Sequence, residues 1–133
     1  AERMASNGMA VAEFLKTKSS ISELFYPGLS DHPGHAVAKR QMRGGFGGML
    51  SFNVGQTQED AKKFISSLKV IKHAVSLGAT ESLICIPYLT TMLYLPPERR
   101  LSFGVCDNTV RLSMGVEKPE ALIGDLEQAL KFL

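Results

Sequence analysis

The sequence predicts an α/β domain, of the α+β kind, with a small, largely antiparallel sheet of four to five strands and helices on one face. Segments with apolar residues at helical spacing alternate along the chain with short segments of strand-like pattern. Several connections are short enough for hairpins. The 133 residues, 44% hydrophobic and 21% charged, match the size and composition of one globular domain, which we expect to span residues 1–133.

The first part of the chain is expected to form two helices and two strands. They are a helix over residues 1–18, a strand over 21–26, a short helix over 33–42 and a strand over 49–54. Met4, Val11 and Phe14 give the first helix an apolar face. Asp31 is placed to cap the second helix. The glycine-rich segment 43–48 predicts a turn that leads into the second strand.

The second part is expected to contain three helices and three strands. They are a helix opened by Thr57, strands over 74–77 and 81–88, a short helix from Pro97 to near Gly104, a strand over 109–114 and a last helix from Pro119. Thr57 and Asp60 have the spacing of a capping box. Residues 109–114 alternate most clearly, with Val110 and Leu112 on one face and Arg111 on the other.

Charge and apolar runs exclude two classes of partner. With 15 Lys and Arg against 13 Asp and Glu, the net charge of +2 gives no concentrated basic face for nucleic acid. The longest uncharged run, Ser82–Pro97, is too short and too rich in proline to cross a membrane. No signal peptide is visible at the N-terminus, and Cys85 and Cys106 form no disulfide framework. We therefore expect a cytoplasmic protein.

Most candidate motifs favour structural roles. The glycines at 44–48 lack the Gly-Lys-Ser/Thr of a phosphate loop, and Leu50 breaks the dinucleotide pattern, so a turn is predicted. His32 and His35 have no acid or cysteine partner nearby, which makes a metal site a weak hypothesis. His73 is interpreted as the cationic end of a helix. Neither cysteine has an evident base partner, so no thiol nucleophile is predicted.

Arg111 is the residue with a functional alternative. An arginine on the polar face of a strand is usually solvated, but its planar guanidinium also matches a carboxylate in bidentate geometry.

The C-terminal motifs resemble those of a known enzyme family. Val110–Glu117 followed by Leu122–Leu130 is similar to the C-terminal end of the Cys/Met-metabolism family of pyridoxal-phosphate enzymes. Further motifs follow in the family's order: Tyr26–Leu29, His32–His35, Phe46–Phe52, Ala74–Gly78, Glu81–Leu83 and Pro97–Arg99. The resemblance covers nearly the whole chain. It implies the C-terminal domain of a fold-type I enzyme, a lyase or transferase of the methionine γ-lyase, cystathionine γ-synthase or cystathionine lyase type.

The resemblance also implies what this chain lacks. The Schiff-base lysine and the other pyridoxal-phosphate contacts lie in the family's large domain, and Lys16 and Lys18 do not match the lysine motif. The parent would bind sulfur amino acids and form a homotetramer, whereas this fragment alone would not be catalytic. A chain that starts at Ala1 rather than Met agrees with a piece of a longer protein. The alternative is a stand-alone, non-catalytic α+β module that binds a small amino acid or a partner protein.

The resemblance assigns the substrate site to four residues. Arg111 corresponds to the arginine that grips the substrate α-carboxylate, the main chain of Ser76 helps to hold the same group, and Thr91 supports them. Val75 stands where cystathionine enzymes usually have glutamate, which favours an uncharged sulfur amino acid. Met92 replaces a family histidine, and the bulky pair Tyr88–Leu89 replaces small residues, so the substrate pocket departs from the family pattern.

Overall fold

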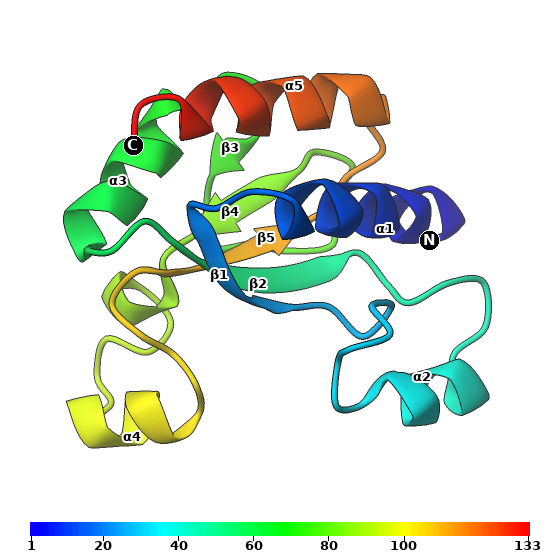
Figure 1. Ribbon diagram of the computed structural model, residues 1–133, viewed down its shortest axis with the longest axis horizontal. Coiled ribbons are helices and arrows are strands. Elements are labelled where there is room, and N and C mark those ends of the chain that lie inside the picture. Colours follow the sequence, from blue (N-terminus) through cyan, green and yellow to red (C-terminus); the bar gives the residue numbers. More distant parts are fainter.

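The computed structural model describes all residues from 1 to 133 and has a five-stranded sheet with five α-helices (Figure 1). The elements in chain order are α1 (Glu2–Lys16), β1 (Ile21–Phe25), α2 (His35–Gln41), β2 (Met49–Val54), α3 (Gln58–Ser67), β3 (Lys72–His73), β4 (Leu83–Cys85), the 3-10 helix η1 (Pro87–Leu89), α4 (Pro97–Ser102), β5 (Thr109–Ser113) and α5 (Pro119–Leu130).

The sheet is mixed, with the strand order β1-β2-β5-β4-β3. The pairs β1–β2, β2–β5 and β5–β4 are antiparallel, whereas β3 and β4 are parallel. The prediction of a largely antiparallel sheet is corrected at this edge. Residues 74–82 do not form a hairpin: they return to the starting end of β3, so that Lys72 pairs with Leu83 and His73 with Ile84.

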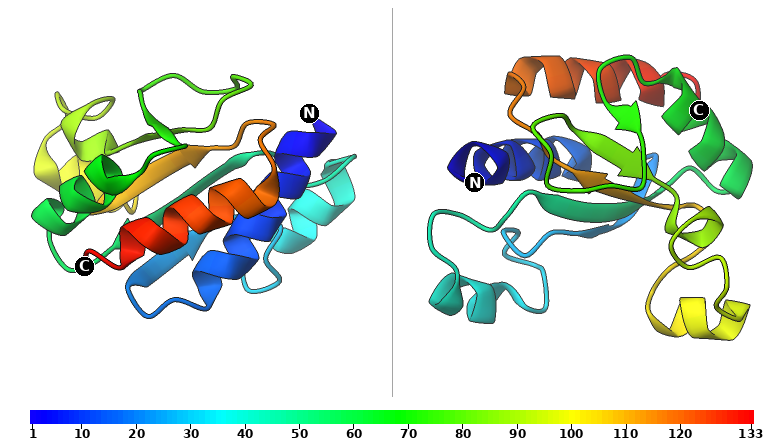
Figure 2. Two further views of the ribbon diagram at one scale, coloured as in Figure 1. Left: turned by 90° about the horizontal axis from the view of Figure 1, so that it is seen from above. Right: turned by 180° about the vertical axis from the view of Figure 1, so that it is seen from behind.

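The three long helices α1, α3 and α5 cover one face of the sheet (Figures 1 and 2). The short helices α2 and α4 lie beyond the other face, at opposite ends (Figure 1). The prediction of helices on one face therefore holds only for the long ones. The apolar core fills the space between sheet and long helices and includes Leu15, Phe52, Phe64, Leu112 and Leu126. No helix combines the length and apolarity that a membrane span requires.

Local signals predicted most element boundaries well. Strand β2 has the predicted bounds, and the capping box of α3 is present: Asp60 N donates to Thr57 Oγ1, and Thr57 N donates to Asp60 Oδ2. The prediction that Asp31 caps α2 is wrong, because α2 begins after Gly34. Asp31 instead lies 3.3 Å from Lys16 Nζ as an ion pair.

The segment after α3 differs from the prediction. Asp125 of α5, which is buried, accepts hydrogen bonds from the main-chain N–H groups of Lys69, Val70 and Ile71 at 2.8–2.9 Å. These bonds end the helical path and turn the chain into β3, so His73 lies in a strand and not at a helix end. Residues 74–77 form no strand, since they leave the sheet edge toward Arg111.

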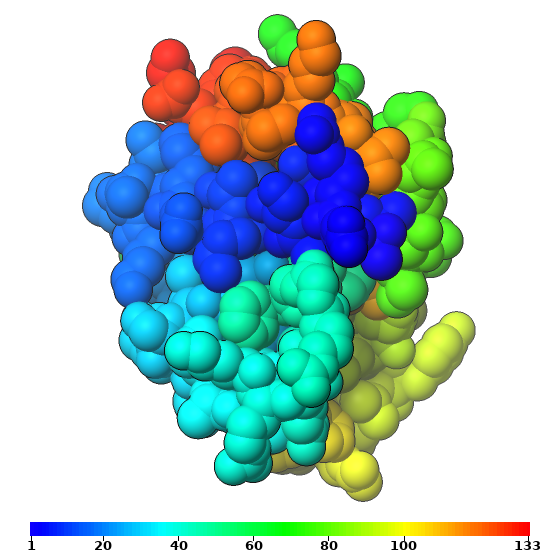
Figure 3. Space-filling view, turned by 90° about the vertical axis from the view of Figure 1, so that its right-hand side faces the viewer, coloured from blue at the N-terminus to red at the C-terminus, as the bar shows by residue number.

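The glycine-rich segment 43–48 is a structural turn, as predicted. Gly44, Gly45 and Gly47 have positive φ, and a Cβ on Gly45 would lie 2.7 Å from the Ala5 Cβ. The Tyr26 hydroxyl lies 2.9 Å from Gly47 O and 3.2 Å from Ala5 O, and burial raises the pKa of Tyr26 to about 12. Figure 3 shows this segment seated directly against α1.

Candidate functional site

Arg111 lies on the face of the sheet that the long helices leave uncovered. Its strand, β5, is central, with β2 on one side and β4 on the other. Val110 and Leu112 point into the core, so the period-2 alternation turns Arg111 to the opposite face. The side chain is half-buried there, with Ser51 of β2 and Cys85 of β4 as its cross-strand partners.

The guanidinium of Arg111 reaches the main chain of the 74–77 segment. Its Nη2 donates to Val75 O and, at 3.4 Å, to Ser76 O. None of the four ion pairs in the structure involves Arg111. Main-chain carbonyls therefore orient the guanidinium without neutralising it, and its other N–H groups can donate hydrogen bonds to an anion.

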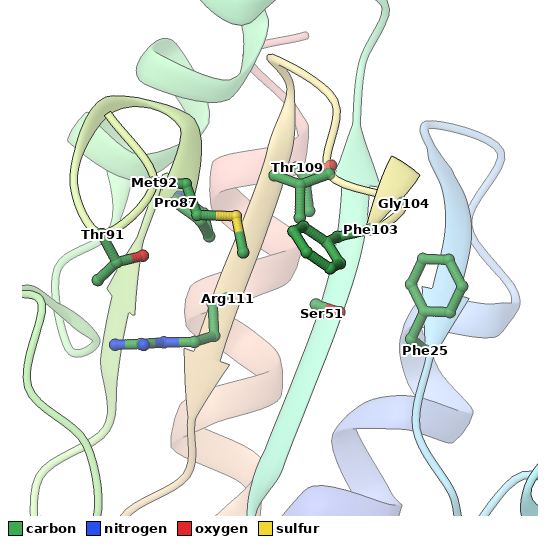
Figure 4. A pocket seen from close by; sticks show the side chains of 10 residues that line it. Phe25, Ser51, Pro87, Thr91, Met92, Phe103, Gly104, Thr109 and Arg111 are labelled. Atoms are coloured by element: carbon green, nitrogen blue, oxygen red, sulfur yellow. The ribbon is translucent and has the colours of Figure 1, made fainter. Parts of the chain in front are cut away.

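A cavity of about 320 Å³ adjoins this arginine (Figure 4). It is lined by Phe25, Ser51, Pro87, Thr91, Met92, Phe103, Gly104, Val105, Thr109 and Arg111. In Figure 4, the guanidinium extends from β5 beneath Thr91, while Phe25 lies at the opposite end of the pocket. The cavity thus has a cationic end and an apolar end, a combination that suits a carboxylate with an apolar side chain.

A β-bulge in β1 turns Phe25 toward the cavity. Ser22 pairs with Asn53, and the next pair is Phe25 with Ser51, so β1 holds one extra residue between these two pairs. Glu23 accommodates the bulge with a φ of 48°. Without the extra residue, Leu24 would lie opposite Ser51, whereas in the structure Leu24 packs against the core.

The structure brings together three of the four predicted site residues through hydrogen bonds: Arg111, Val75 and Ser76. The fourth, Thr91, lines the same cavity as Arg111. Met92, the departure from the family pattern, also lines it. Sequence reasoning missed the contributions of Phe25 and Phe103. No local signal marks Phe25, because regular alternation would place it on the face opposite to Ser51.

The other sequence candidates have structural partners. His32 Nδ1 accepts a hydrogen bond from Gly34 N at 3.0 Å, and His35 Nδ1 lies 2.8 Å from Pro27 O. No group of three or more His, Cys, Asp or Glu side chains is arranged to hold a metal ion. Cys85 is buried and Cys106 half-buried, and both are free thiols.

The fold and the cavity define a class of protein: an α/β domain with an unpaired arginine that suits a small carboxylate. Comparison with known sequences identifies one enzyme family over nearly the whole chain. The profile described as "Cys/Met metabolism PLP-dependent enzyme" matches residues 1–131. The chain belongs to this family.

Individual relatives agree. The chain is 44% identical over 130 residues to cystathionine γ-lyase of Bacillus subtilis, covering 98% of this chain and 34% of that protein. It is also 44% identical over 130 residues to L-methionine γ-lyase of Fusobacterium nucleatum, covering 98% of this chain and 33% of the relative. The crystal structure of cystathionine γ-lyase from Lactobacillus plantarum complexed with L-serine has a TM-score of 0.90 and 40% identity, over 97% of this chain and 33% of that one. The chain thus spans about a third of the length of these relatives.

The cavity does not fit the family cofactor by itself. Covalent attachment of pyridoxal phosphate needs a lysine, and no lysine lines the cavity at Arg111. No carboxylate lines it either, so nothing faces a pyridinium nitrogen there. The donors present suit a small carboxylate and not the cofactor.

Proposed function

We propose that this chain is the C-terminal, substrate-binding part of a pyridoxal-phosphate-dependent lyase or transferase that acts on sulfur amino acids. The carrying observation is Arg111: a guanidinium oriented by two main-chain carbonyls, without an acidic partner, beside a cavity with an apolar end. The relatives are enzymes of this kind, which supports the assignment. The cofactor would be held by a large domain outside this chain.

Arg111 would bind the α-carboxylate of the substrate. A guanidinium donates two parallel hydrogen bonds to a carboxylate, so it sets orientation as well as affinity. The main-chain N–H of Ser76 makes no hydrogen bond within the chain and is free to donate to the same carboxylate. Thr91, above the guanidinium, would support this group. Together these residues would fix the substrate with its α-carbon toward the cofactor domain.

Val75 would influence the choice of side chain. It is 53% exposed, directly before Ser76, and its carbonyl is held by Arg111. An apolar side chain at this position offers no partner to a distal ammonium group, so it favours an uncharged side chain, such as that of methionine, over the charged distal end of cystathionine. The homotetramer implied by the resemblance and the cytoplasmic location expected from the sequence belong to this proposal for the parent protein.

Steady-state kinetics of the full-length protein test the proposal. Arg111→Lys keeps the charge but loses the bidentate geometry, and Arg111→Ala loses both. We expect Arg111→Ala to lower kcat/KM for L-methionine and L-cystathionine by about 30- to 150-fold, equivalent to about 2–3 kcal/mol, mainly through KM. Arg40→Lys, on the exposed face of α2, is the matched control. Kinetics of Arg111→Ala within a few-fold of this control would overturn the assignment.

A further inference from the structure

We propose that Arg100 is a positioning residue that holds together the two segments walling the Arg111 cavity and thereby sets the room for the substrate's side chain. This inference rests on the proposed function, because it concerns the same cavity. Arg100 does not itself line the cavity. Its action would be through the main chain of the segments that it binds.

Arg100 is the one buried residue of α4, with 6% of its surface exposed. Its guanidinium carbon lies 3.5 Å from the centroid of the Tyr88 ring, a stacked cation–π contact. Its Nη1 donates to Tyr88 O at 3.1 Å and to Met92 O at 3.4 Å. One side chain therefore binds both ends of residues 88–92, the segment that carries Thr91.

The main chain of Arg100 holds the second wall. Its carbonyl accepts hydrogen bonds from Phe103 N at 3.1 Å and Val105 N at 3.0 Å. Phe103 and Val105 line the cavity, as do Thr91 and Met92. Arg100 is thus the residue through which the 88–92 and 103–105 segments are linked, although neither segment belongs to the sheet.

The environment of Arg100 demands a guanidinium and not a simple cation. No acid pairs with it, and its charge is met by two carbonyls and an aromatic face. The Nε atom is buried without a hydrogen-bond partner, which is unfavourable for stability. A lysine cannot stack its head on Tyr88 and reach both carbonyls from one plane. An apolar residue would avoid the unpaired donor but would release the 88–92 segment.

The cavity geometry gives this link a defined consequence. A carboxylate at Arg111 directs the rest of the ligand past Thr91 and Met92 toward Phe103. Loss of the Arg100 contacts would move the 88–92 and 103–105 segments, which border the substrate's side chain. It would leave β5 in place, and with it the binding of the carboxylate by Arg111. A long substrate should therefore be affected, and a ligand without a side chain should not.

Hydrogen exchange of the full-length protein tests the link without relying on activity. Arg100→Met keeps the length of the side chain and removes all donors. Arg99→Met is the matched control, since Arg99 is the exposed neighbour on α4 and only approaches the Phe103 ring, at 5.9 Å. We expect Arg100→Met to accelerate exchange at residues 88–95 and 103–105 by at least tenfold, with β2 and β5 unchanged. Unchanged exchange in these segments would overturn the inference.

Steady-state kinetics distinguish a positioning role of Arg100 from a general loss of structure in the site. For Arg100→Met we expect a KM for L-methionine about tenfold higher, a Ki for the competitor glycine within twofold of wild type, and near-normal values for Arg99→Met. Arg100→Lys should lie between wild type and Arg100→Met. If Arg100→Met raised the KM for L-methionine and the Ki of glycine by the same factor, Arg100 would not act by setting the space for the substrate's side chain. If Arg111→Ala leaves kinetics unchanged, the proposed function fails instead, and the exchange experiment alone decides the role of Arg100.

Discussion

The carbonyl oxygen of Val75 accepts a hydrogen bond from Arg111 Nη2, although the two residues are 36 positions apart. This contact draws the 74–77 segment over the uncovered face of the sheet. It also holds the main chain of Val75 at the guanidinium that we assign to the substrate carboxylate, and the Val75 side chain is exposed. We therefore propose that the residue at position 75 influences which ligand side chain is preferred.

Val75→Glu should shift substrate preference toward L-cystathionine. A carboxylate at this mouth can pair with a distal ammonium group, an exposed interaction of about 1 kcal/mol, or about fivefold in the ratio of kcat/KM values for L-cystathionine and L-methionine. Val75→Gln is the control, because glutamine has nearly the same shape as glutamate but carries no charge. A shift of equal size in both variants would show that charge at position 75 does not select the substrate.

Asp125→Asn should destabilise the fold strongly. The buried carboxylate accepts three main-chain hydrogen bonds, and an amide would turn a donor toward some of these N–H groups. We expect a loss of about 2–4 kcal/mol in the free energy of unfolding, measured by urea denaturation. Glu127→Gln, which removes one exposed ion pair at 3.7 Å, should change it by less than about 0.5 kcal/mol. Equal losses of stability in Asp125→Asn and Glu127→Gln would contradict the role of Asp125 in directing the chain into β3.

The capping box of α3 should give stability that disappears in acid. Hydrogen bonds from the main-chain N–H groups of Gln56 and Thr57 lower the pKa of Asp60 below its ordinary value. A carboxyl with a depressed folded pKa stabilises the fold above its unfolded pKa, near 3.9, and loses this effect as pH falls through the folded pKa.

The pH dependence of Tm for wild type and Asp60→Asn measures this effect. The wild type should have the higher Tm from pH 7 to about pH 5, and the difference should shrink below about pH 4. Glu59→Gln is the control at the neighbouring exposed position, because it removes a carboxylate and its exposed ion pair with Lys62 but leaves the capping box intact. A wild-type advantage that persists unchanged down to pH 3 would contradict the assignment.

The β1 bulge should tolerate glycine at position 23 and reject a β-branched residue. Glu23 has a φ of 48°, a conformation open to glycine and strained for valine. We expect Glu23→Gly to change the free energy of unfolding by less than about 0.5 kcal/mol, and Glu23→Val to lower it by about 1–2 kcal/mol. Equal effects of the two substitutions in urea denaturation would argue against the bulge that places Phe25 in the cavity.

Sequence reasoning succeeded where the cause of a structure is local. The alternation around Arg111 predicts β5 and its two faces, and the Thr57–Asp60 spacing predicts the start of α3. Sequence reasoning failed where residues far away in the sequence determine the path of the chain. The path of residues 69–77 depends on Asp125 and Arg111, which lie more than 30 positions away.

The candidate site was only partly readable from residue patterns. Chemistry alone singled out Arg111, since a guanidinium on the polar face of a strand can bind a carboxylate. Val75, Ser76 and Thr91 came from the family resemblance, because nothing in their spacing marks them. Phe25 could not be found by either route, since a one-residue bulge reverses the face on which it lies.

A crystal structure of the full-length protein with a bound sulfur amino acid tests the central claim most directly. The account predicts that the α-carboxylate oxygens lie within about 3.2 Å of two Arg111 nitrogens, with the side chain directed toward Met92 and Phe103. A bound amino acid whose carboxylate is held by other residues, with Arg111 still facing only Val75 and Ser76, would contradict it.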